Sequence, residues 1–311
     1  MRKSILTLIA AASLAFGGAV HCQEQRTPSR SKPNEVVIDF HMHIPYHLIA
    51  KTLVSAKEKG LDALVFTDYN SADKFDRIAE NKDPDGKQIL PRYWDIRKVS
   101  NRLLKVSFPQ GELYLPRGEE IRVTQPRKGD ILVCGTEKSI AGGMDAKTTF
   151  QEVYSQGGIG GFAHLCAPLF YGLGEEVFLD VMKTFNPRQF PLFLEKNAQV
   201  PERNFDYNSQ VEELARKHNV ALVGDSDAHG NYLWEYQQVG VKYHSVIEGI
   251  SPSDNLIEDL SKTFRNSPQS IRIKGNYNHI FRNAAWNAVS TMKNFGPKVK
   301  STLEGLRQGK K

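Results

Sequence analysis

Cysteine is scarce in this chain, with only three in 311 residues. Three cysteines are too few for a network of disulfide bonds, so we expect a fold that depends on its buried core. Cys134 and Cys166 lie in separate apolar segments and are expected to be core thiols, because spacing alone does not support a bridge between them. Long apolar runs are scarce as well. After the first 19 residues, no run is long enough for us to expect a transmembrane span.

Charge of a single sign is also limited. The hydrophobic content of 40% and the charged content of 24% are typical of a soluble globular protein of one large domain or two small ones. The net charge is +6, but much of the excess lies in the last 19 residues, where six Lys and Arg face only Glu304. We therefore expect a solvated basic tail, and we do not favour nucleic acid as the partner, although it stays open.

The N-terminus has the pattern of an export signal. Arg2 and Lys3 precede an apolar stretch at 5–16, and small residues follow at 17–19. The prediction is a signal peptide over 1–19, a flexible linker over 20–34, and a periplasmic or secreted protein. An alternative is a lipoprotein signal ending before Cys22, although His21 stands where a small residue is usual.

Short apolar segments alternate with amphipathic ones through the middle of the chain. Strands are expected at 36–40, 63–67, 113–117, 131–135, 159–163, 191–195 and 221–224, and helices at 48–59, 149–155, 175–185 and 209–218. Such alternation predicts parallel pairing in an α/β fold. Seven strands suit a closed barrel or a doubly wound sheet, and we favour the barrel, over residues 35–250. Residues 251–311 would be a C-terminal extension with the basic tail.

Metal-binding side chains stand at the ends of these strands. His41 and His43, two of only nine histidines, share one face of the first strand because side chains alternate along a strand. Similar residues follow or begin the other strands: Asp68, Tyr69 and Asn70; Glu119 and Glu120; Asp130; His164; Glu195 and Asn197; Asp225, Asp227 and His229. Barrel enzymes gather their catalytic groups at the carboxyl ends of the strands. The pattern therefore predicts a metal site there.

Each of these residues alone has a simpler interpretation. His164 among apolar residues is typical of a hydrogen-bonded core histidine, and Asp68 is typical of a turn. Glu119 and Glu120 alone would be read as a solvated pair. The metal interpretation depends on the coincidence of His, Asp and Glu at successive strand ends.

In this order, the motifs resemble those of the PHP family, the polymerase and histidinol phosphatase superfamily. The matching stretches are DFHMH at 39–43, GLD at 60–62 leading to Thr67 and Asp68, GEEI at 118–121, Ala163-His164, and SDAH at 226–229. They cover roughly residues 36–230 and are specific as a set, although each is weak alone. The resemblance implies a distorted seven-stranded barrel that holds up to three divalent metals, usually zinc, manganese or iron, for phosphoester hydrolysis.

The resemblance also implies a role for each matching residue. His41, His43, Glu120 and Asp227 would form the first metal site, and Glu120 would bridge to a second site at His164. His229 would belong to a third site, with His47 a tentative further ligand. The chain departs from the family twice, with Tyr69 and Asp130 where histidine is usual. Because a phenol with a pKa of about 10 is a poor ligand, we expect one or two tightly bound metals and no well-occupied third site.

Function follows as an expectation. Two metals would activate a water molecule and stabilise the attacking and leaving oxygens of a phosphoester. Asp68 and Tyr69 are the catalytic candidates, and Arg122, Lys138 and Asn197 are tentative substrate-binding residues. The prediction is an exported metal-dependent phosphoesterase that acts on a small phosphorylated molecule. Two alternatives stay open: hydrolysis of a carboxylic ester or amide, and metal binding without turnover.

Overall fold

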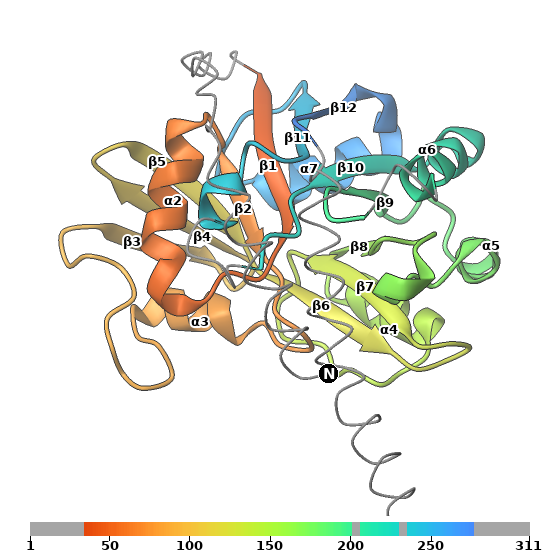
Figure 1. The fold of residues 1–311 in the computed structure, drawn as a ribbon, viewed down its shortest axis with the longest axis horizontal. Helices are drawn as coiled ribbons and strands as arrows, with labels where there is room; N and C mark the ends of the chain where they lie inside the picture. Colours follow the sequence, from red (N-terminus) through yellow and green to blue (C-terminus); the bar gives the residue numbers. More distant parts are fainter. Residues whose placement is uncertain (1–33, 201–205, 230–234, 277–311) are drawn as a thin grey trace, which may run out of the picture.

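The computed structural model describes residues 34–200, 206–229 and 235–276, coloured along the chain in Figure 1. The predicted signal peptide, Cys22 and the basic tail at 293–311 lie outside the described residues. No helix among the described residues combines the length and the apolar character that a membrane crossing requires.

The described residues form twelve strands and six α-helices, and strands follow one another without a helix between them from residue 95 to residue 134. The strands are β1 (Glu35–Met42), β2 (Ala63–Phe66), β3 (Asp95–Ser100), β4 (Leu103–Phe108), β5 (Gly111–Pro116), β6 (Gly118–Val123), β7 (Gly129–Cys134), β8 (Ile159–Phe162), β9 (Leu192–Asn197), β10 (Ala221–Asp225), β11 (His244–Glu248) and β12 (Ile271–Lys274). The α-helices are α2 (Ile49–Glu58), α3 (Asp73–Glu80), α4 (Ala146–Ser155), α5 (Glu175–Thr184), α6 (Tyr207–His218) and α7 (Leu256–Asn266). Four short 3₁₀ turns complete the set: η1 (Tyr46–Leu48), η2 (Pro168–Phe170), η3 (Glu235–Gln238) and η4 (Pro268–Ser270).

The strands form two sheets. The larger has seven strands in the order β12-β11-β1-β2-β5-β4-β3, and the smaller has five in the order β10-β9-β8-β7-β6. Only part of the pairing is parallel, namely β1 with β2, β2 with β5, β8 with β9, and β9 with β10. The remaining neighbours pair antiparallel, including β1 with β11 and both neighbours of β7.

The predicted closed barrel is therefore wrong: the described residues form two open sheets. All seven predicted strands are present, but they do not close into one ring. Closure of a barrel would pair the first and last predicted strands, β1 and β10, but β1 pairs with β11 instead, which runs antiparallel. At the other end, the segment that begins at Gly118 forms β6 and starts the second sheet, instead of ending a parallel strand.

Helices cover the outer faces of both sheets (Figure 1). Buried side chains of α2, among them Ile49 and Leu53, pack with those of β2 and β5 in one core cluster. A second cluster joins α4, α5 and α6 to the five-stranded sheet. Helix α2 ends where Gly60 adopts a φ of +83°, a left-handed conformation that glycine takes without a steric cost.

A third core cluster lies between the two sheets and holds them together. Phe40 of β1, Phe193 of β9 and Phe264 of α7 meet there, with ring centroids 5.7–5.8 Å apart. All three are buried, and aromatic pairs at this spacing add to the apolar area that they bury. Because α7 supplies one of the three rings and β12 pairs with β11, the fold continues well past residue 250.

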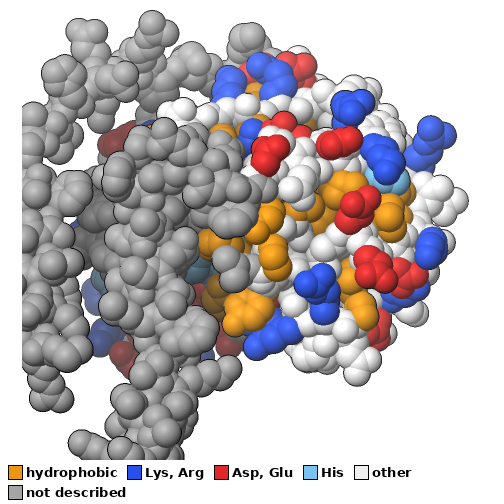
Figure 2. Space-filling model, turned by 45° about the vertical axis from the view of Figure 1, so that its right-hand side comes forward, with side chains coloured by type: hydrophobic (Ala, Val, Ile, Leu, Met, Phe, Trp, Pro, Cys, Tyr) orange, Lys and Arg blue, Asp and Glu red, His pale blue; other side chains and the backbone are white. Residues whose placement is uncertain are grey.

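The surface carries charges of both signs. On the face shown in Figure 2, Lys and Arg alternate with Asp and Glu around scattered apolar side chains. Interspersed charge of this kind is ordinary for a solvated surface and does not form a broad basic face there.

Candidate metal centre

Four chain segments bring the proposed ligands together where the two sheets meet. His41 and His43 lie at the end of β1, Glu120 lies in β6, His164 follows β8, and Asp227 follows β10. Backbone hydrogen bonds from Asp227 N to His41 O (2.9 Å) and from His43 N to Ala228 O (2.7 Å) join the first and last of these segments.

Gly118 allows Glu120 to reach the same place. A Cβ at Gly118 would lie 2.2 Å from a side-chain carbon of Val65 and 2.9 Å from the carbonyl oxygen of Phe66. No larger residue fits this close approach of β6 to β2. The segment beyond β2 then pairs with β6, since Asn70 N donates to Glu120 O at 2.8 Å.

Nitrogen and oxygen atoms converge in one half of the cluster, formed by His41, His43 and Asp227. The Nε2 atoms of the two histidines are 2.9 Å apart, and Asp227 Oδ1 lies 3.5 Å from the first and 3.8 Å from the second. Glu120 Oε2 approaches the same two nitrogens at 3.4 and 3.0 Å. Four atoms that face one point are the arrangement that a divalent cation with imidazole and carboxylate ligands requires.

Glu120 connects this half to a second one, formed by Asp130 and His164. Its other oxygen, Oε1, lies 3.3 Å from His164 Nε2. Atoms of Glu120, Asp130 and His164 lie within 4.8 Å of one another, as do atoms of His41, His43 and Asp227, and both groups could hold a metal ion. Both oxygens of Glu120 are buried, and the groups that face them are imidazole nitrogens of His41, His43 and His164. A buried carboxylate in this position is costly when those imidazoles are neutral, and cations at its two oxygens would remove that cost.

Glu195 and Asn197 of β9 form hydrogen bonds to two residues of the first half, His41 and Asp227. Glu195 Oε1 accepts a hydrogen bond from His41 Nδ1 at 2.6 Å, and Asn197 Nδ2 donates to Asp227 Oδ2 at 3.0 Å. With its proton on Nδ1, His41 keeps the lone pair of Nε2 free for a cation, as in many metal sites. Glu195 also accepts a hydrogen bond from the backbone N of His164.

The buried histidine and carboxylate groups shift one another's pKa in opposite directions. Burial lowers the pKa of His41, but the carboxylates of Asp227, Glu195 and Glu120 outweigh burial and raise that pKa well above its usual value. Burial acts to raise the pKa of Glu120, yet the facing histidines hold it well below the usual value. These pKa shifts favour imidazolium at His41 and an ionised carboxylate at Glu120, whereas burial lowers the pKa of His43. Protons would therefore compete with a cation at His41.

Two more buried carboxyl groups lie beside the first half. Burial raises the pKa of Asp225 well above the usual value, and the charge of Glu195 and a side-chain hydrogen bond with it act in the same direction. Burial raises the pKa of Asp39 to about 7. Atoms of Asp225, Glu195 and His41 form a third group that could hold a metal.

Two backbone conformations at the cluster are unusual. His164 has a φ of 34° and Asp227 a φ of 46°, in the left-handed region that favours glycine. Asp227 is held there by its backbone bond to His41, and His164 by its bond to Glu195. Left-handed residues other than glycine concentrate at functional sites, where the surrounding structure enforces them.

Arg122 and Asp130 form a pair at the edge of the cluster. Arg122 Nη2 donates to Asp130 Oδ2 at 2.9 Å, and Nε donates to Oδ1. Burial raises the pKa of Asp130 to about 7, and the Glu120 carboxylate acts in the same direction. Arg122, predicted to bind substrate, is thus committed in part to a carboxylate of the second half.

Tyr69 covers the outer side of His43. The two rings stack with centroids 4.6 Å apart, and half of the Tyr69 surface is exposed. Partial burial, with the carboxylates of Glu120 and Asp227, raises the pKa of its hydroxyl above the usual value, so the neutral phenol is the stable form.

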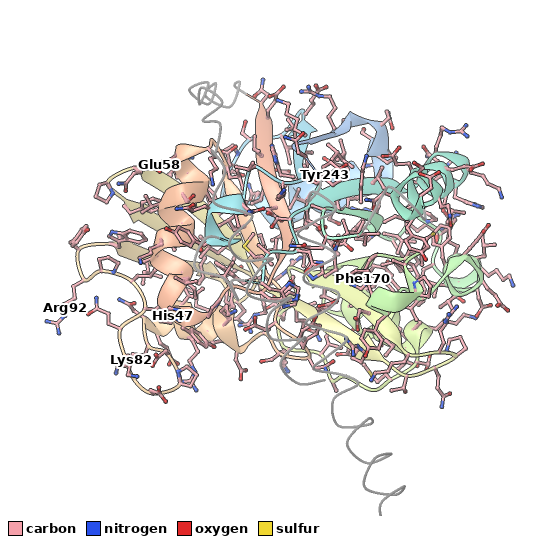
Figure 3. The ribbon with its side chains drawn as sticks, viewed as in Figure 1. His47, Glu58, Lys82, Arg92, Phe170 and Tyr243 are labelled. Atoms are coloured by element: carbon pink, nitrogen blue, oxygen red, sulfur yellow. The ribbon has the colours of Figure 1, made fainter. Side chains whose placement is uncertain are left out.

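A pocket of about 700 Å³ opens beside His43. His47, Asp68 and His229 line it, together with Lys74, whose Nζ donates to Asp68 Oδ1 at 2.5 Å. His229 Nδ1 lies 3.4 Å from Asp227 Oδ1. His47 is exposed on η1, on the α2 side of the molecule (Figure 3).

The other tentative residues lie apart from this pocket. Asn197 is buried, and its Nδ2 atom donates to Asp227 and Glu195, so it orients carboxylates. Lys138 is exposed, and within the described residues its backbone N donates to Gln156 Oε1. The sequence pattern places Glu195 and Asp225 at strand ends but assigns them no role there, and no sequence pattern indicates Lys74.

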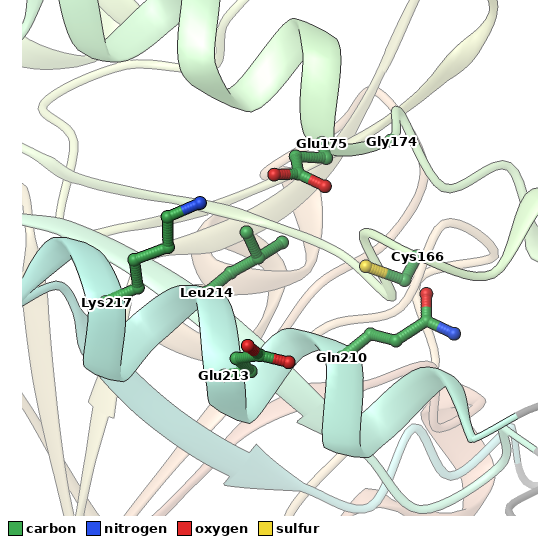
Figure 4. A pocket seen from close by; sticks show the side chains of 7 residues that line it. All are labelled: Cys166, Gly174, Glu175, Gln210, Glu213, Leu214 and Lys217. Carbon is green, nitrogen blue, oxygen red and sulfur yellow. The ribbon is translucent and has the colours of Figure 1, made fainter.

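A smaller pocket of about 280 Å³ lies between α6 and the start of α5, and shares no lining residue with the cluster. Figure 4 shows Cys166 beside Gln210, with Glu175, Glu213 and Lys217 around the same space. Burial raises the pKa of the Cys166 thiol to about 11, so the unreactive thiol predominates near neutral pH.

Fold and cluster together define a class, an α/β protein with buried histidine and carboxylate groups that could hold metal ions. No protein-family model matches the sequence. No curated protein sequence matches it either. Among solved structures, the chain is similar to Endonuclease Q in complex with a 27-mer duplex substrate with an abasic lesion at the active site. The identity is 12% and the TM-score is 0.43, over 72% of this chain and 57% of that chain. A likeness of this degree assigns no function.

Proposed function

We propose that the protein is an exported hydrolase of the PHP type that depends on divalent metal ions and cleaves a phosphoester. The observation that carries this proposal is the buried Glu120 carboxylate, which faces only imidazole nitrogens, those of His41 and His43 with one oxygen and that of His164 with the other. The motif resemblance supports the same ligand set, and the N-terminal sequence pattern supports export.

The residues present fit such metals. His41, His43, Glu120 and Asp227 would hold one ion, and Glu120, His164 and Asp130 would hold a second. Zinc, manganese and iron all accept this mixture of imidazole and carboxylate. When bound, such ions activate water and stabilise the negative charge of a phosphoryl group.

The chain's own residues would orient the reaction. Glu195 fixes the ring of His41 through Nδ1, and Asn197 holds Asp227 through Oδ2. Tyr69, with a neutral hydroxyl beside His43, would donate a hydrogen bond near the leaving group. Asp68 lines the neighbouring pocket, where its bond to Lys74 fixes its orientation toward a substrate.

The test compares Glu120→Gln with Glu119→Gln in the full chain. Both residues are buried in β6, but Glu119 accepts hydrogen bonds from Ile140 N and Ser139 Oγ, at 2.8 Å each, and serves as the matched control. Metal content and hydrolysis of phosphomonoesters and phosphodiesters are measured with and without a chelator. We expect Glu120→Gln to lose metal and activity, and Glu119→Gln to keep both.

Other outcomes identify the alternatives. Hydrolysis of carboxylic esters or amides without phosphoester hydrolysis would show that the same metal centre serves a carboxylic ester or amide hydrolase. Tight metal binding without any turnover would favour a non-catalytic metal-binding protein. Normal metal content in Glu120→Gln would contradict the proposed centre.

A further inference from the structure

Exposed tyrosines lie at the edge of the metal centre. Among the described residues, four large apolar side chains are exposed: Tyr69 (50%), Tyr93 (75%), Tyr171 (40%) and Val241 (45%). Two of them, Tyr69 and Tyr171, flank the same guanidinium group. Arg122 Cζ lies 5.5 Å from the ring centroid of Tyr69 and 4.0 Å from that of Tyr171. Tyr69, Arg122 and Tyr171 are called the tyrosine–arginine row below.

The row begins at the proposed ligands and leads outward. At its inner end, the Tyr69 ring stacks on His43, and Arg122 binds Asp130 with two nitrogens. Arg122 stands two residues after Glu120 in β6, so both side chains project from the same face of the strand. A ligand held on the row would therefore extend directly from the metal centre.

The row is held in place before any ligand binds. Tyr171 has a φ of 63°, and its carbonyl oxygen accepts a hydrogen bond from Asp130 N at 3.1 Å. Arg122 N donates to Asn70 Oδ1 at 2.7 Å, which ties β6 to the segment that carries Tyr69. Groups that are already ordered lose little conformational entropy when a ligand binds.

Positive charge surrounds the outer end of the row. Arg127 and Lys128 are exposed in the turn between β6 and β7, and Lys128 Nζ lies 5.1 Å from the Tyr171 ring centroid. Aromatic rings beside exposed cations suit a ligand that is both flat and anionic. Nucleobases stack on such rings, and the attached phosphates pair with Lys and Arg. A neutral sugar would stack on the rings but would leave the cations unused.

We infer that the tyrosine–arginine row is a subsite for a nucleobase attached to the phosphoester at the metal centre. This inference rests on the proposed function and names its substrate class, a nucleotide or the end of a single strand. Tyr171 would stack on the base, Arg122 would extend the stacking surface, and Lys128 would swing to a neighbouring phosphate. These are binding roles, and the chemistry stays at the metal centre.

The experiment pairs two substrates that differ at C1′, where adenosine 5′-monophosphate carries adenine and ribose 5-phosphate carries a hydroxyl group. Hydrolysis of both is measured for the full-length wild type, Tyr171→Ala, Tyr171→Phe and Tyr93→Ala, each loaded with the same metal. Tyr93 is exposed but outside the row, so Tyr93→Ala is the control for loss of a surface ring. A short single-stranded oligonucleotide distinguishes a strand end from a free nucleotide.

We expect the wild type to prefer the nucleotide, and Tyr171→Ala to lower kcat/KM for it about tenfold. The loss on ribose 5-phosphate should be much smaller in that variant, and Tyr171→Phe and Tyr93→Ala should resemble the wild type. Equal losses on both substrates, or no preference for the nucleotide in the wild type, would overturn the subsite.

Binding measurements separate this inference from the proposed function. Calorimetry with adenosine monophosphate and with ribose 5-phosphate reports the subsite even if no phosphoester is cleaved. If neither compound is hydrolysed, tighter binding of adenosine monophosphate than of ribose 5-phosphate, lost in Tyr171→Ala, would still support the subsite. Hydrolysis that ignores the base, with no base-dependent affinity, would overturn the subsite and leave the phosphoesterase proposal standing.

Discussion

The two halves of the cluster differ in how their negative charge is compensated. In the half that contains Asp130, both carboxylate oxygens already accept hydrogen bonds from Arg122. In the half that contains Asp227, Oδ2 accepts a neutral hydrogen bond from Asn197, and Oδ1 is buried without a donor. The Arg122 guanidinium already neutralises part of the Asp130 charge, so a metal ion would gain less there. We therefore expect the Asp227 half to bind a metal more tightly than the Asp130 half.

The largest expected effect is in Asp227→Asn, compared with Asp130→Asn. Asp227→Asn should weaken metal binding by more than about 100-fold and abolish hydrolysis, because it removes the uncompensated anionic oxygen. Asp130→Asn should keep the tight metal and lose only the weaker one. Metal content per chain, measured at increasing chelator concentration, separates the two.

Thermal unfolding of both metal-free variants is the control, since a misfolded chain would lose metal for a trivial reason. Equal metal loss in the two variants would show that the two halves bind metal as one unit, and that Arg122 does not make the Asp130 half the weaker site.

A smaller effect is expected from Glu195→Gln. The Glu195 carboxylate accepts hydrogen bonds from His41 Nδ1, Asn197 Nδ2 and His164 N. An amide in its place turns one oxygen acceptor into a donor and leaves one of these groups without a partner. Groups that orient metal ligands in this way typically change metal affinity by about 10- to 100-fold.

Competition with a metal-sensitive dye measures the affinity, and Glu119→Gln again provides the matched buried control. An unchanged affinity in Glu195→Gln would mean that His41 is oriented by packing alone.

The strands and the residues at their ends were predictable because both are local features. His41 and His43 share a face through simple alternation, and the apolar segments around them mark strands. The direction of pairing is not local. The segment that begins at Gly118 has three polar residues in six, so it read as a strand end, yet it forms β6 and pairs antiparallel with β7.

Residues that act through other residues were harder to find. Glu195 stands at a strand end like the proposed ligands, but its value comes from the distance of 2.6 Å to His41, which is 154 positions away. Tyr171 has no motif around it. It matters because its left-handed backbone conformation and the β6–β7 turn place its ring beside Arg122. Contacts of this kind depend on tertiary packing and have no sequence period.

The smallest effect is expected at Tyr69, where a third metal site would lie. His229 and His47 line the pocket beside His43, but the position next to Asp68 offers a neutral phenol, whose pKa is raised further by partial burial and nearby carboxylates. A neutral phenol is a weak donor, whereas imidazole binds these metals well. Tyr69→His should therefore raise the metal content by about one ion per chain. Tyr69→Phe, which removes only the hydroxyl, should leave it unchanged. Turnover measured alongside shows whether the hydroxyl assists the leaving group, because Tyr69→Phe would then lower kcat at constant metal content. Three tightly bound metals in the wild type would contradict this account of Tyr69.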